Sequence, residues 1–166
     1  MDLNTIIIGL IITAVIVVPI AYIQWSQKIE KKKTKTAFIN NAKQNKIQVS
    51  HMDFWGTYYG IGLDSQKNVL VYSKKTEENP VWLSVNLNTI KTCYIDTVTQ
   101  HIKTKTANKV ETERLNLVLK TKHAQDTVVL EFYNVDVNFE MTTEHPLLQK
   151  WQNLITAALT TSKMAA

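Results

Sequence analysis

The sequence predicts an α+β protein, in which an apolar helix near the N-terminus precedes a mostly antiparallel sheet of about six strands and a C-terminal amphipathic helix. Three observations predict this order. An uncharged apolar run occupies residues 6–23, period-two alternation dominates the middle of the chain, and a 3.6-residue period replaces it near residue 145. With 166 residues, the chain has room for one ordinary domain besides the first helix.

The apolar run predicts a transmembrane helix over residues 5–25, after a short tail at residues 1–4. Its eighteen core residues would span about 27 Å, close to the hydrocarbon thickness of a bilayer. Pro19 is tolerated in membrane helices, and Trp25 stands at one end, where aromatic rings favour the headgroup level. A cleaved signal peptide is the alternative. It requires basic residues at the N-terminus, whereas the only charged side chain among the first five residues is Asp2.

The formal net charge of +5 comes from one segment of the chain. Residues 1–50 contain seven lysines against two carboxylates, whereas residues 51–166 are neutral. Five of the lysines directly follow the apolar run: Lys28, Lys31, Lys32, Lys33 and Lys35. Because basic flanks stay on the cytoplasmic side, they predict a single-pass inner-membrane protein with its N-terminus outside and its domain in the cytoplasm. A neutral domain also argues against a nucleic-acid partner.

The lysine-rich segment, residues 26–50, admits two roles. The five lysines can serve membrane topology alone. They can also contact anionic lipid, which is worth about 1 kcal/mol for each lysine near a charged surface. The end of this segment, residues 37–45, is typical of a short, weakly amphipathic helix or linker.

Strands are predicted across the domain, residues 51–162, with short connections that favour antiparallel pairing. They are expected at residues 55–63, 69–72, 82–85, 92–102, 115–119 and 128–132. Gly60 and Gly62 indicate a bend or bulge in the first strand. The aromatic cluster of Phe54, Trp55, Tyr58 and Tyr59 is expected in the core and on the sheet faces, and any exposed part of it would be a protein-binding surface.

The final helix is predicted at about residues 145–160. Pro146 suits the first helical position. One apolar face follows at helical spacing: Leu147, Leu148, Trp151, Leu154, Ile155, Ala158 and Leu159. A sheet with one apolar face needs a cover, and we expect this helix to supply it.

Three segments carry a resemblance to a known group of proteins: Tyr59–Asp64, Leu130–Asn134 and Leu148–Ile155. They resemble stretches of short, uncharacterised membrane-anchored bacterial proteins with a pleckstrin-homology-like C-terminal domain. The resemblance implies a curved sheet closed at one end by the terminal helix, together with an anchored arrangement. It implies no activity, and the six strands counted here are one fewer than the seven of that fold.

No residue pattern predicts a catalytic site, a cofactor site or a metal site. Cys93 is the only cysteine and falls on the apolar side of a strand, where an inert buried thiol is expected. The four histidines lack the close spacing of a helical zinc pair. The sequence therefore favours a membrane-tethered, non-enzymatic interaction or adaptor module with an unknown protein partner. A lipid- or envelope-sensing module that uses the lysines and the open end of the sheet is the alternative, and an enzyme without a recognisable motif is the third.

Overall fold

The computed structural model describes residues 3–56, 58–75, 80–103, 108–122, 126–138, 141 and 143–164. Within these residues the chain forms two α-helices, one 3₁₀ turn and seven strands. The elements are α1 (Leu3–Gln44), β1 (His51–Trp55), β2 (Tyr59–Asp64), β3 (Val69–Lys74), β4 (Val81–Asn86), η1 (Leu87–Thr89), β5 (Ile90–Lys103), β6 (Asn108–Thr121), β7 (Thr127–Asn134) and α2 (Glu144–Met164).

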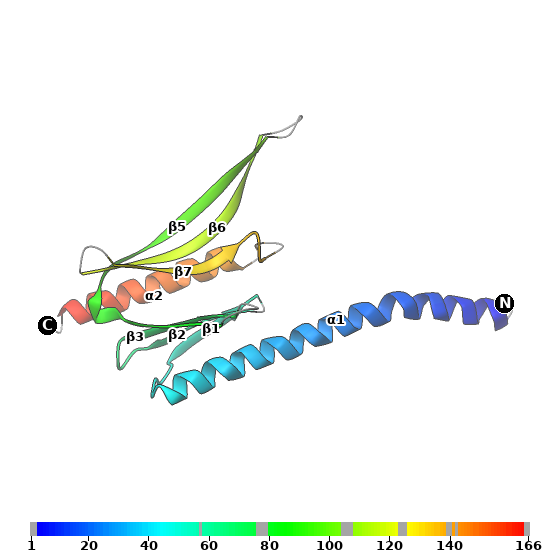
Figure 1. The fold of residues 1–166 in the computed structure, drawn as a ribbon, viewed down its shortest axis with the longest axis horizontal. Coiled ribbons are helices and arrows are strands. Elements are labelled where there is room, and N and C mark those ends of the chain that lie inside the picture. The colour runs from blue at the N-terminus through cyan, green and yellow to red at the C-terminus, as the bar shows by residue number, and fades with distance from the viewer. Residues whose placement is uncertain are drawn as a thin grey trace.

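The strands form two antiparallel sheets, which lie in separate layers (Figure 1). The first sheet has the order β1-β2-β3-β4 and the second has the order β5-β6-β7, so every strand pairs with its neighbour in sequence. The chain passes from one sheet to the other through η1. The side chain of Asn86 caps this turn by accepting a hydrogen bond from the Asn88 backbone N–H at 3.0 Å.

One hydrophobic core joins the two sheets and α2. Along β6, Leu115, Leu117 and Leu119 are fully buried, as the alternating pattern predicts. From α2, Leu148, Trp151 and Ile155 are fully buried, and the other members of the predicted apolar face pack around the same core: Leu147, Leu154, Ala158 and Leu159. The prediction of a C-terminal helix that covers the sheet is therefore confirmed.

The second half of α1 packs against the outer face of the first sheet, opposite the second sheet (Figure 1). Phe38 and Ala42 are buried there with Val71 of β3. As a result, β2 is covered on both faces and all six of its residues are buried. Its two glycines lie under α1, because a Cβ on Gly60 would stand 3.0 Å from the ring of Phe38 and one on Gly62 would stand 3.1 Å from it.

The structure corrects the predicted strand count and the expected role of the glycines. The segment expected as one strand at residues 55–63 belongs to a hairpin of β1 and β2, which turns at Gly56 with φ at +54°. A glycine accepts that angle without a steric penalty. Gly60 and Gly62 sit in unbroken register with β1 and β3, so they serve the close approach of α1 instead of a bulge.

Of the two alternatives for residues 37–45, a short helix or a linker, the structure shows the helix, and it joins this helix to the apolar run. Helix α1 continues through the lysine-rich segment and ends at Gln44. Residues 37–44 therefore belong to this helix, and residue 45 lies just beyond its end. This continuation is stabilised by packing, because Phe38 contacts the aromatic rings of Phe54 and Trp82 at centroid distances of 5.2 Å and 5.1 Å.

The apolar part of α1 does not meet the requirements of the predicted membrane span. In the portion of the chain whose side chains the structure describes, no helix is long and apolar enough to cross a membrane. The side chains of residues 5–12, which belong to the predicted span, lie outside that description. From Thr13 onward the uncharged stretch is short, because the same helix runs on into Lys28 and Glu30. The predicted single-pass inner-membrane location, with its outward N-terminus and cytoplasmic domain, is therefore wrong.

Candidate binding cleft

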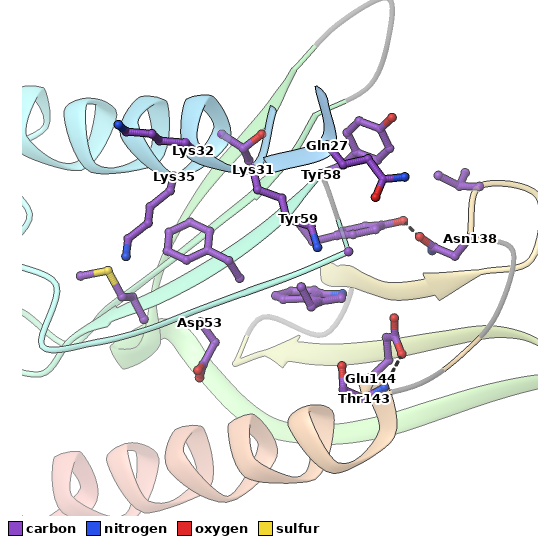
Figure 2. A pocket seen from close by; sticks show the side chains of 16 residues that line it. Gln27, Lys31, Lys32, Lys35, Asp53, Tyr58, Tyr59, Asn138, Thr143 and Glu144 are labelled. Carbon is purple, nitrogen blue, oxygen red and sulfur yellow. Dashed lines mark hydrogen bonds between the residues drawn. The ribbon is translucent and has the colours of Figure 1, made fainter. Parts of the chain in front are cut away.

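A cleft of about 1030 Å³ opens between α1, the hairpin of β1 and β2, and the start of α2 (Figure 2). It forms because α1 docks on the sheet at Phe38, while the preceding turns of the helix extend past the end of the hairpin. Three separate parts of the chain line it: Gln27, Lys31, Lys32, Thr34 and Lys35; Met52 to Gly56 with Tyr58 and Tyr59; and Val137, Asn138, Thr143 and Glu144.

The α1 side of the cleft is basic. Lys31 and Lys35 lie one helical turn apart, and in Figure 2 both side chains extend from α1 toward the hairpin. The Lys35 ammonium lies 5.9 Å from the centroid of the Phe54 ring, within the range of a cation–π contact. Among the described residues, no ion pair involves Lys31, Lys32 or Lys35.

The floor of the cleft is aromatic and rigid. The Trp55 ring stacks on Tyr59 at 5.3 Å and on Phe132 at 4.4 Å, and its indole N–H donates to the Phe132 carbonyl at 2.8 Å. Tyr58, by contrast, exposes 39% of its surface at the mouth of the cleft. The predicted aromatic cluster is thus buried in part, with an exposed edge at the cleft.

The acidic groups on the α2 side already have partners within the protein. Asp53 accepts hydrogen bonds from Lys150 at 2.6 Å and from the Trp151 indole at 2.9 Å, and its side chain points toward α2 in Figure 2. Glu144 is only 4% exposed and accepts from the Thr143 backbone N–H at 2.8 Å. The cleft is therefore electrostatically asymmetric, with exposed ammonium groups facing carboxylates that are held by donors.

A half-buried polar network behind the floor fixes the position of Tyr59. Glu131 of β7 accepts from the Tyr59 hydroxyl at 2.8 Å and from the Lys74 ammonium at 2.6 Å, and Asn138 donates to the Tyr59 oxygen at 3.3 Å. Burial raises the pKa of Glu131, but the hydrogen bonds from Lys74 and Tyr59 outweigh it, so this pKa lies below its usual value. Burial and the adjacent carboxylate raise the pKa of Tyr59, which keeps the phenol protonated.

The five lysines singled out in the sequence occupy different environments. Lys31, Lys32 and Lys35 line the cleft. Lys33 pairs with Glu30 at 3.0 Å, and Lys28 is exposed on α1 away from the cleft lining. The sequence analysis assigned no role here to Asn138, Thr143 or Glu144. Only the folded chain brings them near α1, and no local pattern marks them.

The remaining candidate chemistry is sparse within the described residues. Burial raises the pKa of Cys93 to about 12, which agrees with the predicted inert thiol on the apolar side of β5. No group of three or more metal-ligating side chains is found in the part of the chain that the structure covers. His123 lies outside the described residues, as does the side chain of His101.

Comparisons with known proteins identify no relative of this chain. No family model, curated protein or solved structure matches it. The function is therefore inferred from the geometry of the cleft.

Proposed function

We propose that this protein is a non-enzymatic interaction module that holds a negatively charged partner in the cleft between α1 and the β1–β2 hairpin. One observation carries the proposal. Lys31 and Lys35 face the cleft without an ion-pair partner among the described residues, while the nearby Asp53 is held by Lys150 and Trp151.

The surroundings of the lysines favour binding over a purely solvated role. The α1 wall carries exposed ammonium groups, which attract an incoming anion. The aromatic floor gives such a partner rigid surface at a low cost in conformational entropy, and aromatic residues are enriched at protein interfaces. Tyr58 is the exposed part of this aromatic surface, and the neighbouring Trp55 and Tyr59 are buried and fixed by stacking and hydrogen bonds.

A binding titration of the full-length chain tests the proposal, with a short peptide of alternating glutamate and valine as the probe. We expect saturable binding that weakens as salt is added, because the lysines are solvent-accessible. The double variant Lys31→Gln/Lys35→Gln should bind about tenfold more weakly, at roughly 0.7 kcal/mol for each lost charge. Lys43→Gln is the matched control, since Lys43 is an exposed lysine of the same helix outside the cleft.

Two results would contradict the proposal. The first is that the wild-type protein does not bind the peptide. The second is that the double variant Lys31→Gln/Lys35→Gln and the Lys43→Gln control lose the same amount of affinity. Either result would show that the cleft lysines have no specific role in holding an anion.

The alternative function, recognition of anionic lipid headgroups, remains a second proposal because a phosphate could approach the same lysines. Vesicles with and without anionic lipid, added in place of the peptide, separate the two. The pleckstrin-homology-like architecture also stays a proposal, supported by the four-stranded and three-stranded sheets and the terminal helix.

A further inference from the structure

The strand beside the cleft stands at the edge of its sheet. β1 is the first strand in the order β1-β2-β3-β4, and within the described residues no strand pairs with its other side. An edge strand presents backbone N–H and C=O groups that can pair with another extended chain.

The lining of the cleft shows that it runs along this edge. Four consecutive residues of β1, Met52 to Trp55, line the cleft. Because successive side chains of a strand point to opposite faces of the sheet, a cleft on one face would touch only alternate residues. In Figure 2, β1 accordingly lies between the two walls, with the lysines of α1 on one side and Asp53 directed to α2 on the other.

The spacing of the lysines fits an added strand. Lys31 and Lys35 are four residues apart, which is about 6 Å along a helix. Alternate residues of a strand are about 6.7 Å apart and point the same way. Figure 1 shows that α1 runs alongside the first sheet, and the contacts place Lys35 over Phe54 and Phe38 over Gly60 and Gly62.

We propose that the partner is an extended acidic segment of another protein, which adds as a strand to β1 with alternate carboxylates directed at Lys31 and Lys35. This inference rests on the proposed function. The intervening side chains of the added strand face the Asp53 and Glu144 side, where a carboxylate would meet negative charge. The segment therefore alternates acidic residues with apolar or neutral polar ones, as in peptides that bind by strand addition.

Two forms of the glutamate–valine peptide separate strand addition from simple charge attraction. In the second form the nitrogens of both the valines and the glutamates are methylated, which keeps every carboxylate but removes the backbone donors that face β1, whichever residues supply them. We expect the methylated peptide to bind the full-length chain about fivefold to tenfold more weakly, since each lost hydrogen bond costs a few-fold in affinity. The unmodified peptide should also slow hydrogen exchange at the backbone amides of residues 52–54, with no such change at residues 81–86 on the opposite edge.

The outcomes distinguish this inference from the proposed function. If both peptides bind equally well and both depend on Lys31 and Lys35, strand addition is overturned while anion binding in the cleft stands. If neither peptide binds, both proposals fail. If anionic vesicles bind through these lysines and the peptides do not, the partner is a lipid headgroup and the strand-addition inference is wrong.

Discussion

Gly62 lies beneath α1 at one of the closest approaches between the helix and the first sheet. A Cβ at this position would stand 2.7 Å from Val49 Cγ1 and 3.1 Å from the Phe38 ring. Both neighbours are packed, so Gly62→Ala should destabilise the protein by about 1–3 kcal/mol through overpacking, despite the general advantage of alanine over glycine in a strand. Urea unfolding of the variant measures this change.

Val49→Ala provides the matched control for that steric explanation. In the double variant with Gly62→Ala the shorter side chain leaves room for the new methyl group, so the loss should be smaller than the sum of the two single losses. Additive losses would show that the contact with Val49 does not limit this position.

Glu131 couples the stability of the network to pH. Its pKa is lowered in the folded protein, so its contribution is complete above its ordinary value of 4.5 and is lost as the pH falls through the folded value. Glu131→Gln should therefore cost about 2 kcal/mol near pH 7, because Lys74 and Tyr59 lose a charged acceptor. The difference from wild type should shrink at an acidic pH below the lowered pKa of Glu131, where the wild-type carboxylate is also neutralised.

Unfolding free energies at both pH values, with Asp126→Asn as an exposed carboxylate control, test this prediction. A difference between wild type and Glu131→Gln that stays constant with pH would show that the charge of Glu131 adds nothing to folding.

At the scale of elements, the docked half of α1 depends on one aromatic side chain. Phe38 is 2% exposed and contacts the rings of Phe54 and Trp82. Phe38→Ala should cost about 3 kcal/mol of packing. Because this outer cluster is separate from the main core, we expect the loss to appear as local release of α1.

Hydrogen exchange can resolve that local release. Amides of residues 29–44 should exchange faster in Phe38→Ala, while those of residues 115–119 should keep their protection. Asn40→Ala, an exposed substitution on the same helix, should leave both groups unchanged. A uniform loss of protection across the whole chain would mean that α1 and the sheets unfold as one unit.

The elements differ in how far the sequence predicts them, and the physical reason is the range of the interactions. α2 was predicted closely because its seven apolar residues repeat at helical spacing and bury one face. A helix was one of two alternatives for residues 37–45, but its docking on the sheet was not predicted, because it depends on contacts with Gly60, Gly62 and Trp82, which are distant in sequence. The hairpin at Gly56 was missed because aromatic residues on both sides of a single glycine suggested one continuous strand.

At the scale of the whole molecule, hydrogen bonds join the two sheets, and we expect the sheets to unfold as one cooperative unit. The Trp55 indole donates to Phe132 O at 2.8 Å, and the Tyr72 hydroxyl donates to Glu131 O at 2.7 Å. Trp55→Phe should keep the stacking but leave the Phe132 carbonyl without this donor, at a cost of about 1–3 kcal/mol. Unfolding followed separately by fluorescence and by circular dichroism should still give coincident transitions. Separate transitions would indicate that the sheets unfold independently.

The cleft itself could be predicted only in part. The sequence pattern indicated the lysines and the aromatic cluster, and it predicted that any exposed edge of that cluster would be a protein-binding surface. It could not place them together, because the lining comes from three segments that only the fold brings side by side. The membrane assignment was wrong because no helix in the described part of the chain is long and apolar enough to cross a membrane.

A charge-swap titration tests the central claim most directly. The variant Lys31→Glu/Lys35→Glu reverses the charge of the cleft wall, so we predict that it loses affinity for the glutamate–valine peptide and gains affinity for a lysine–valine peptide of the same length. Wild type should show the opposite preference. If both proteins prefer the same peptide, the lysines of α1 do not determine what this cleft holds, and the account of its function is contradicted.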